Sequence, residues 1–487
     1  MLRPIHGLTR VVEGAQLGGR FDGRDGHAVA DISPALLSDL ETALGSDAVR
    51  GAAQVALLDP GAEQGNLAAG LAVRPATADD VAQILRLCAA AGVGVVAQGG
   101  RTGLSGAALT SPGQIILLSD RLGGGVEIDP LDRTALVGAG VTLEALQEAA
   151  ALHGLSSGID LAARGTATVG GMIATNAGGM EAFRFGMMRQ RLLGLEGVLA
   201  DGTVVSDLTR VAKANEGYDL KQLFCGSEGT LGIVTRAVLR LEQRDPPGQT
   251  ALLAVRSAAD AVEVMRDVQN RGALLLAEIM WRAYAHAAAE ALGLARVIGF
   301  CDAPVYLVLS LAGGSDEAVE AFAPAMEAGL IHDAILAQND REAADIWRIR
   351  EDSFAAERGI AHRLWFDISV PLSGLDAYVS GLEARLAGID PHLQVFILGH
   401  LGDGNLHLTI ARDAPLDAPG KLAVERAVEA GLRDAGGAIS AEHGIGTEKR
   451  ASLARCLPPG KLHAMRLLKQ ALDPKGILNP GKIFAPG

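Results

Sequence analysis

Three glycine-rich stretches constrain the fold of this chain more than any other feature of its 487 residues. The first, QGGRTGLSG at residues 98–106, follows a strand-like segment and spaces Gly100, Gly103 and Gly106 three apart. Because glycine permits positive φ and close backbone approach, successive N–H groups of such a loop can form a concave nest for a diphosphate. The loop lacks the spacing of the GxGxxG dinucleotide fingerprint, so a plain turn is an equal alternative on this stretch alone.

The two longer stretches, residues 158–186 and 213–235, are dense in Gly, Ala, Ser and Thr and contain few bulky side chains. This composition is typical of backbone that wraps closely around a ligand, although a pair of long connections would also explain it. Long glycine-rich loops in a compact domain are more often functional than idle, so the three stretches together indicate a ligand site.

Strand and helix patterns alternate around these stretches. Thr77 is a candidate helix N-cap, and Gly92 is the candidate end of that helix. From residue 249 the order strand, helix, strand occurs twice, which predicts a ferredoxin-like sheet covered by helices on one side. Two prolines and a glycine in residues 242–250 mark a domain boundary.

We therefore predict an α+β protein with a two-part α/β first domain, a ferredoxin-like α/β cap domain, and a C-terminal segment that returns to the first domain. The expected divisions are an N-terminal extension at 1–50, the first domain at 51–245, the cap domain at 246–465 and the C-terminal segment at 466–487.

Charge and cysteine content narrow the class of protein. The formal net charge of −14, without clustered Lys and Arg, argues against a nucleic-acid partner. Four cysteines lie far apart without a CxxC pair, which argues against a disulfide framework and a zinc finger. We find no signal-peptide core and no run of about 18 apolar residues. The expectation is a cytoplasmic protein without a transmembrane segment, with peripheral membrane contact left open.

A polar cluster interrupts an apolar, strand-like run in FILGHLGDGNLHLTI, residues 396–410. His400 and His407 would face opposite sides of one flat strand, but the Gly-Asp-Gly between them is a natural turn or bulge that can bring them together. Further along, AISAEHGIGTEK places Glu442 beside His443. Two imidazoles and a carboxylate are the ligand set of an open catalytic zinc or a related divalent metal, while hydrogen-bonded core histidines are the alternative.

With these motifs together, the sequence resembles flavoproteins with the FAD-binding fold of vanillyl-alcohol oxidase, in the branch of D-2-hydroxyglutarate and D-lactate dehydrogenases. The resemblance runs from about residue 50 to the C-terminus, and the three loops match in order and spacing. It implies FAD, with the diphosphate on the first loop. The implied cofactor contacts are Gln98, Gly99, Gly100, Arg101, Thr102, Gly103, Ser105, Gly106, Thr166, Gly170, Gly171, Asn176, Gly179, Gly229, Ile233 and, in ILNPGK, Asn479.

The resemblance also implies how the flavin is held and which residues act on the substrate. Relatives with covalent flavin usually attach it through a histidine in or beside the first loop, or through a later cysteine, and this loop has Arg101 and no histidine, so we expect non-covalent FAD. The implied roles are a divalent metal, with zinc the expected ion, on His400, His407 and Glu442, the catalytic base on His443, and substrate contacts on Asn405 and Arg350. For Arg350, the expected carboxylate ligand, a surface arginine paired with Glu351 or Asp352 is the alternative.

The sequence departs from the D-2-hydroxyglutarate pattern at two positions. Relatives carry a threonine four residues after the arginine and a lysine two residues before the aspartate of DISVP, where this chain has Phe354 and Trp365. In a chain with 3% aromatic residues, we interpret this pair as lining an apolar substrate pocket, with core packing as the alternative.

The expected enzyme is an FAD- and metal-dependent dehydrogenase that oxidises a D-2-hydroxy acid to the 2-oxo acid. We expect a lactate-like monocarboxylic substrate with room for an apolar side chain. The sequence does not identify the electron acceptor, because a quinone, a cytochrome or an electron-transfer flavoprotein would each leave little mark on it, and a homodimer is left open. Alternatives are a D-2-hydroxyglutarate dehydrogenase proper, an alkylglycerone-phosphate-synthase-like enzyme, a non-catalytic FAD-binding oxidase subunit, and a metal-dependent hydrolase without flavin.

Overall fold

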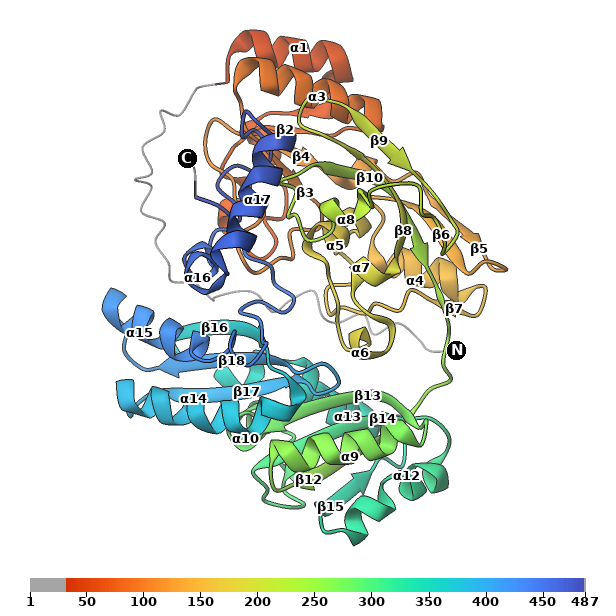
Figure 1. The fold of residues 1–487 in the computed structure, drawn as a ribbon, viewed down its shortest axis with the longest axis vertical. Helices are drawn as coiled ribbons and strands as arrows, with labels where there is room; N and C mark the ends of the chain where they lie inside the picture. Colours follow the sequence, from red (N-terminus) through yellow and green to blue (C-terminus); the bar gives the residue numbers. More distant parts are fainter. Residues whose placement is uncertain (1–31, 486–487) are drawn as a thin grey trace.

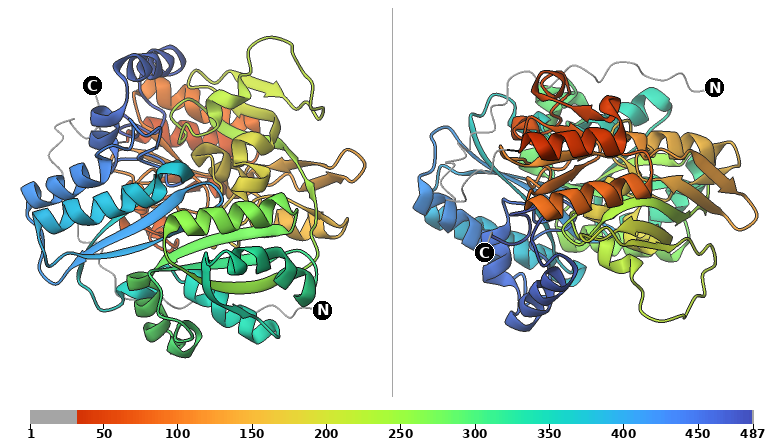
Figure 2. Two further views of the ribbon diagram at one scale, coloured as in Figure 1. Left: turned by 60° about the horizontal axis from the view of Figure 1, so that its bottom comes forward. Right: turned by 90° about the horizontal axis from the view of Figure 1, so that it is seen from above.

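The computed structural model describes residues 32–485, which form two α/β domains shown one above the other in Figure 1. The first domain begins with a mostly parallel sheet of strand order β1-β2-β4-β3. Its strands are β1 (Val49–Arg50), β2 (Ala72–Val73), β3 (Val95–Gln98) and β4 (Ile115–Leu118). The helices α1 (Pro34–Leu44) and α3 (Ala78–Ala91) lie side by side on it (Figure 2, right).

Local sequence explains the bounds of α3. Thr77 Oγ1 accepts a hydrogen bond from Asp80 N, and the Asp80 carboxylate accepts one from Thr77 N, so the helix starts with a capping box. Gly92 ends it with φ 68°, a left-handed conformation that glycine adopts without strain. The predicted cap and end of this helix are confirmed.

Part of the predicted N-terminal extension packs on the first domain. Leu36 and Leu40 of α1 are buried in the same core as α3, and β1 pairs with β2. The earlier residues, 1–31, lie outside the described part of the chain.

A second sheet of the first domain is antiparallel, with the order β5-β6-β10-β8-β9. Its strands are β5 (Val126–Asp129), β6 (Thr134–Gly138), β8 (Leu192–Val198), β9 (Val204–Asp207) and β10 (Ile233–Arg240). The helices and short elements around it are α2 (Ala52–Val55), α4 (Leu143–Ala151), β7 (Leu155–Ser156), α5 (Val169–Thr175), α6 (Ala182–Phe185), α7 (Met188–Arg191), α8 (Lys221–Phe224) and β11 (Glu242–Gln243).

The second domain is built on one antiparallel sheet with the order β15-β12-β14-β13-β17-β18-β16. Its strands are β12 (Gln249–Val255), β13 (Leu274–Trp281), β14 (Val305–Leu311), β15 (Ile331–Leu336), β16 (His362–Ser369), β17 (Gln394–His400) and β18 (Asn405–Arg412). Its helices are α9 (Ala258–Asn270), α10 (Arg282–Ala291), α11 (Ala295–Ile298), α12 (Ser315–Glu327), α13 (Asp340–Glu351), α14 (Leu375–Ile389) and α15 (Ala418–Glu429). Strands β12 to β15 with α9 and α12 have the predicted ferredoxin-like order.

The prediction that helices cover this sheet on one side is wrong. Leu253 of β12 packs in the core formed with α9 and α12, whereas Leu252 packs in a separate core with α10 and α13. Residues 250–255 of β12 are all buried, because neighbouring side chains point to opposite faces and both faces are covered. The continuous apolar run ALLAV at residues 251–255 was the available sequence signal for burial on both faces.

The C-terminal segment returns to the first sheet after α16 (Arg450–Cys456) and α17 (Pro459–Leu472). Val95 N donates to Ile477 O at 2.7 Å, and Asn479 N donates to Val95 O at 2.8 Å, which extends the sheet beside β3. Within residues 32–485, no helix combines the length and apolar character needed to cross a bilayer.

Candidate active site at the domain junction

A loop at residues 441–448, just before α16, is bound by a buried carboxylate of the first domain. Glu228 accepts hydrogen bonds from the successive amides of Ile445 at 2.6 Å and Gly446 at 2.7 Å. The side chain of Glu228 is almost fully buried, and this burial raises the pKa of its carboxyl, while the two amide bonds satisfy its oxygens and offset part of the lost hydration.

Two of the glycine-rich stretches contact the same loop directly. Gly179 N donates to Glu442 Oε1 at 2.6 Å, and Thr447 N donates to Ser105 O at 3.0 Å. The predicted cofactor loops and the predicted metal ligand Glu442 therefore belong to one continuous region between the domains.

Close backbone packing explains two of the glycines in the first loop. A Cβ on Gly99 would lie 2.1 Å from Thr168 Oγ1, and one on Gly100 would lie 2.0 Å from Thr166 O. Gly103 differs, because nothing lies within 4 Å of the position of its Cβ. Part of the glycine pattern thus serves contact between the first and second stretches, and Gly103 leaves open backbone.

The other predicted cofactor residues lie along these loops. Arg101, Thr102, Ser105 and Gly106 follow Gly100 on the first loop, Thr166, Gly170 and Gly171 lie around the start of α5, Asn176 and Gly179 follow that helix, and Gly229 and Ile233 lead into β10.

Two of the predicted cofactor side chains are occupied by the protein itself. Asn479 accepts from Ala97 N at 2.9 Å and donates to Glu228 O at 2.6 Å. Asn176 Oδ1 accepts from Arg189 N at 2.9 Å. These amides hold the loops in place relative to one another.

Polar atoms without partners remain beside the loops. Among the described residues, the buried atoms Ser105 Oγ, Ser227 Oγ and Gln98 Oε1 have no hydrogen-bond partner in the chain. Because unsatisfied buried polar groups are costly, these atoms and the open backbone at Gly103 fit a polar ligand such as the diphosphate portion of FAD.

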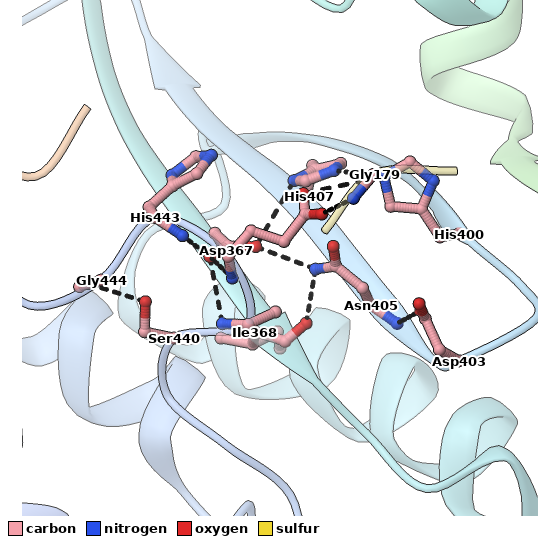
Figure 3. Close-up of polar contacts among 12 residues, drawn as sticks. Gly179, Asp367, Ile368, His400, Asp403, Asn405, His407, Ser440, His443 and Gly444 are labelled. Atoms are coloured by element: carbon pink, nitrogen blue, oxygen red, sulfur yellow. Dashed lines mark hydrogen bonds and ion pairs between the residues drawn. The ribbon is translucent and has the colours of Figure 1, made fainter. Parts of the chain in front are cut away.

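The two histidines lie on adjacent strands of a hairpin, and the Gly-Asp-Gly segment forms its turn, as predicted. The register pairs His400 with Asn405 and Leu398 with His407. Cross-strand partners project from the same face of a sheet, so both imidazoles lie on one side. Figure 3 shows them next to each other.

The nitrogen and oxygen atoms of the predicted metal ligands converge. His400 Nε2 lies 3.3 Å from His407 Nε2 and 3.9 Å from Glu442 Oε2. Two nitrogens bound to one tetrahedral zinc at about 2.0–2.1 Å would be about 3.3 Å apart, so the donor set fits a metal ion.

Asp367, which the sequence analysis did not select, organises the loop with the predicted base. Its Oδ2 accepts from the amides of Ala441, Glu442 and His443 at 3.1, 2.8 and 2.9 Å. Its Oδ1 accepts from Asn405 Nδ2 at 2.9 Å (Figure 3). One fully buried carboxylate thus fixes residues from two parts of the predicted site.

Burial and charge set the protonation of Asp367 and His443. Burial opposes ionisation of Asp367, but His443, Lys449 and His407 outweigh it and hold the pKa of this carboxyl well below its usual range. Burial lowers the pKa of His443, partly offset by Asp367. A neutral imidazole at His443 is the form that can accept a proton.

Glu278 is a second residue that the sequence analysis did not select. It is fully buried in β13, with Oε1 2.8 Å from His400 Nδ1 and Oε2 2.6 Å from Arg350 Nη2. Arg350 is only 5% exposed, which excludes the surface-arginine alternative. A glutamate inside the apolar run ALLLAEIM, like the aspartate inside LWFDISV, was the available signal.

The aromatic pair lies near the surface of the same region. Phe354 is 51% and Trp365 38% exposed, and their rings meet edge to face at 6.1 Å, so packing in the core does not explain them. Trp365 Nε1 donates to the buried Glu357 carboxylate at 2.9 Å. Arg363, two residues before Trp365 on β16, has its guanidinium 5.5 Å from the indole ring.

Comparisons with known proteins agree with this architecture. The FAD binding domain family matches residues 69–207, and the family of FAD linked oxidases, C-terminal domain, matches residues 245–483. D-2-hydroxyglutarate dehydrogenase of Xanthomonas citri pv. viticola is 37% identical over 422 residues, covering 84% of this chain and 88% of that protein. The mitochondrial D-2-hydroxyglutarate dehydrogenase of Bos taurus is 36% identical over 422 residues, covering 85% and 76%.

Solved structures share the fold at low sequence identity. A substrate-bound p-cresol methylhydroxylase has a TM-score of 0.69 at 17% identity, covering 93% of this chain and 96% of that chain. An alkyldihydroxyacetonephosphate synthase has a TM-score of 0.66 at 16% identity, covering 93% and 87%. The chain belongs to the FAD-linked oxidoreductases of the vanillyl-alcohol oxidase fold, in the branch that contains the D-2-hydroxyglutarate dehydrogenases.

Proposed function

We propose that this protein is an FAD- and divalent-metal-dependent dehydrogenase that oxidises a D-2-hydroxy acid to the 2-oxo acid. The observation that carries the proposal is the convergence of His400, His407 and Glu442 on one point, beside a buried arginine and directly against the glycine-rich loops. FAD supplies the acceptor of the hydride that leaves Cα, and the protein must supply the rest.

The metal ligands would be His400 Nε2, His407 Nε2 and the Glu442 carboxylate, a set that suits zinc and leaves positions for a substrate. A divalent ion there would act as a Lewis acid toward the substrate's hydroxyl and carboxylate oxygens. Gly179 N donates a hydrogen bond to Glu442 Oε1 and so orients the carboxylate. This bond connects the proposed metal ligand to the second glycine-rich stretch.

The remaining residues have separate roles in proton transfer and in binding the substrate. His443 accepts the hydroxyl proton as a neutral base, and Asp367 keeps the backbone of His443 in place. Arg350 offers a planar guanidinium to the carboxylate. Asn405 Oδ1 is buried without a partner among the described residues, while Asn405 Nδ2 is fixed by Asp367, so this oxygen is available as an acceptor for the substrate.

The substrate that we favour is a monocarboxylic, lactate-like acid with room for an apolar side chain. Phe354 and Trp365 offer exposed aromatic surface at the positions where D-2-hydroxyglutarate enzymes have polar groups, and Glu357 fixes the indole. Contact with this aromatic surface would stabilise a hydrocarbon side chain of the substrate, whereas a second carboxylate of the substrate would lose hydration there.

D-2-hydroxyglutarate is the second candidate, because Arg363 lies beside this aromatic surface. Arg363 and Trp365 are two residues apart on β16, so their side chains share a face of the sheet. The relatives named as D-2-hydroxyglutarate dehydrogenases also favour this substrate.

The test is the visible spectrum of purified protein under nitrogen with a panel of D- and L-2-hydroxy acids. We expect flavin bands that bleach with D-enantiomers only, fastest with lactate or larger apolar acids. A higher kcat/KM for D-2-hydroxyglutarate would select the second candidate. Flavin that stays oxidised with every acid would contradict the dehydrogenase, and a colourless protein would point to a hydrolase without flavin.

A further inference from the structure

Glu278 contacts two groups of the site with different proposed ligands: His400, which would bind the metal cation, and Arg350, which would bind the substrate's carboxylate. One carboxylate oxygen contacts His400 Nδ1 at 2.8 Å, and the other lies 2.6 Å from Arg350 Nη2. The glutamate is fully buried at one end of the β13–β17 pairing, directly opposite His400 in register. It reaches the proposed metal through the histidine and the proposed substrate carboxylate through the arginine.

The contact with His400 fixes which nitrogen is free. A carboxylate is only an acceptor, so Nδ1 must carry the proton that it donates to Glu278. In the neutral imidazole, which is the form that binds a metal, Nε2 then keeps its lone pair toward His407 Nε2, 3.3 Å away. Carboxylate partners of this kind orient a metal-binding histidine and raise its basicity.

The contact between Glu278 and Arg350 reduces the net positive charge that the substrate's carboxylate would meet at Arg350. Arg350 is nearly buried, and Glu278 is the carboxylate paired with it among the described residues. The Arg350 Nε atom has no hydrogen-bond partner in the described chain, so the guanidinium keeps an unused donor. An incoming carboxylate thus binds an arginine whose charge Glu278 already balances in part.

We propose that Glu278 is a positioning residue that strengthens metal binding through His400 and weakens anion binding through Arg350. This inference rests on the proposed function, because it takes its metal and its carboxylate ligand from there. It predicts that loss of the Glu278 charge shifts the two affinities in opposite directions, which general damage to the fold would not do.

The experiment compares the parent protein with Glu278→Gln, which keeps the size of the side chain and removes its charge. The dissociation constant for zinc is measured by competition with a chelator, and that for pyruvate is measured by calorimetry on metal-free protein. Pyruvate is chosen because a 2-oxo acid does not reduce oxidised flavin. We expect zinc to bind about 10- to 100-fold more weakly and pyruvate to bind more tightly in the variant.

Glu196→Gln is the matched control. Glu196 is also a buried glutamate at 2.6 Å from an arginine, Arg236, but it lies in the second sheet of the first domain. Both affinities should stay at the parent values in this variant. Circular dichroism and flavin content check the folding of each protein.

A second variant covers failure of Glu278→Gln to fold. The double variant Glu278→Gln/Arg350→Gln removes both buried charges together, so no charge is left uncompensated. It must still bind zinc about 10- to 100-fold more weakly than Arg350→Gln alone. Equal zinc affinities in these two proteins would overturn the proposal.

The outcomes separate this inference from the function that it rests on. Zinc affinity within about threefold of the parent in Glu278→Gln, or weaker pyruvate binding, would overturn the role of Glu278 and leave the proposed function intact. A parent protein that binds no zinc would overturn the metal assignment and the role of Glu278 with it.

Discussion

The glycine-rich loops and the histidine hairpin use their characteristic residues in different ways. In the loops, Gly99 and Gly100 allow the backbone of one stretch to contact another stretch. The side-chain amide of Asn479 forms hydrogen bonds with backbone groups. In the hairpin, the Nε2 atoms of His400 and His407 face each other, and His400 Nδ1 contacts the side chain of Glu278. The loops are thus recognisable by what they allow the backbone to do, and the hairpin by what its side chains can bind.

Removal of the proposed base should produce the largest effect and would test the hairpin side of this comparison. In His443→Ala the flavin should stay bound, because His443 is not in the glycine loops, while its reduction by substrate should slow about 100- to 10,000-fold. Stopped-flow absorbance under nitrogen measures the rate. His463→Ala on exposed α17 is the control, and rapid reduction in His443→Ala would remove this residue from the role.

Loss of the Asp367 carboxylate, which accepts hydrogen bonds from the loop at residues 441–448, should have the next largest effect. Asp367→Asn replaces an acceptor of three amides by a group that brings its own N–H donors among them. We expect the free energy of unfolding to fall by about 1–3 kcal/mol, with a slower reduction of the flavin. Urea unfolding measures the first quantity, and an unchanged midpoint would show that the three bonds do not stabilise this loop.

A pair of alanine substitutions sharpens the comparison on the loop side. A Cβ at Gly100 would collide with Thr166 O, whereas one at Gly103 meets open space. Gly100→Ala should destabilise the protein by about 1–3 kcal/mol and reduce the bound flavin. In flavin-free protein, where no cofactor lies against this loop, Gly103→Ala should stay within about 0.5 kcal/mol of the parent. Equal thermal shifts in the two variants would contradict the loop-to-loop packing that we describe.

The smallest expected effect concerns substrate preference. Trp365→Lys restores a cation where the D-2-hydroxyglutarate enzymes have one, and a charged hydrogen bond of about 1.5–3 kcal/mol corresponds to about tenfold or more. The ratio of kcat/KM for D-2-hydroxyglutarate over D-lactate should rise by that factor. If the ratio does not move, Trp365 does not face the substrate's side chain.

Short sequence motifs predicted the features of the fold that depend on residues close together in the sequence, such as helix ends and a hairpin turn. Thr77 and Gly92 gave the bounds of one helix, and the turn between the two histidines followed from its glycines. Glu278 and His400 are far apart in the sequence and meet only through strand pairing, so no spacing rule could find them. Their shared signal was a charged residue inside an apolar strand, which indicates burial with a partner but does not identify the partner.

In the function that we propose, oxidation needs a metal ion held by the two histidines of the hairpin and Glu442. The direct measurement is anaerobic bleaching of the flavin by the fastest D-2-hydroxy acid before metal removal, after it, and after zinc is restored. We predict an unchanged flavin spectrum without metal, a reduction rate lower by about 100-fold or more, and recovery with about one zinc per chain. Bleaching at the full rate by protein shown to be metal-free would contradict the account.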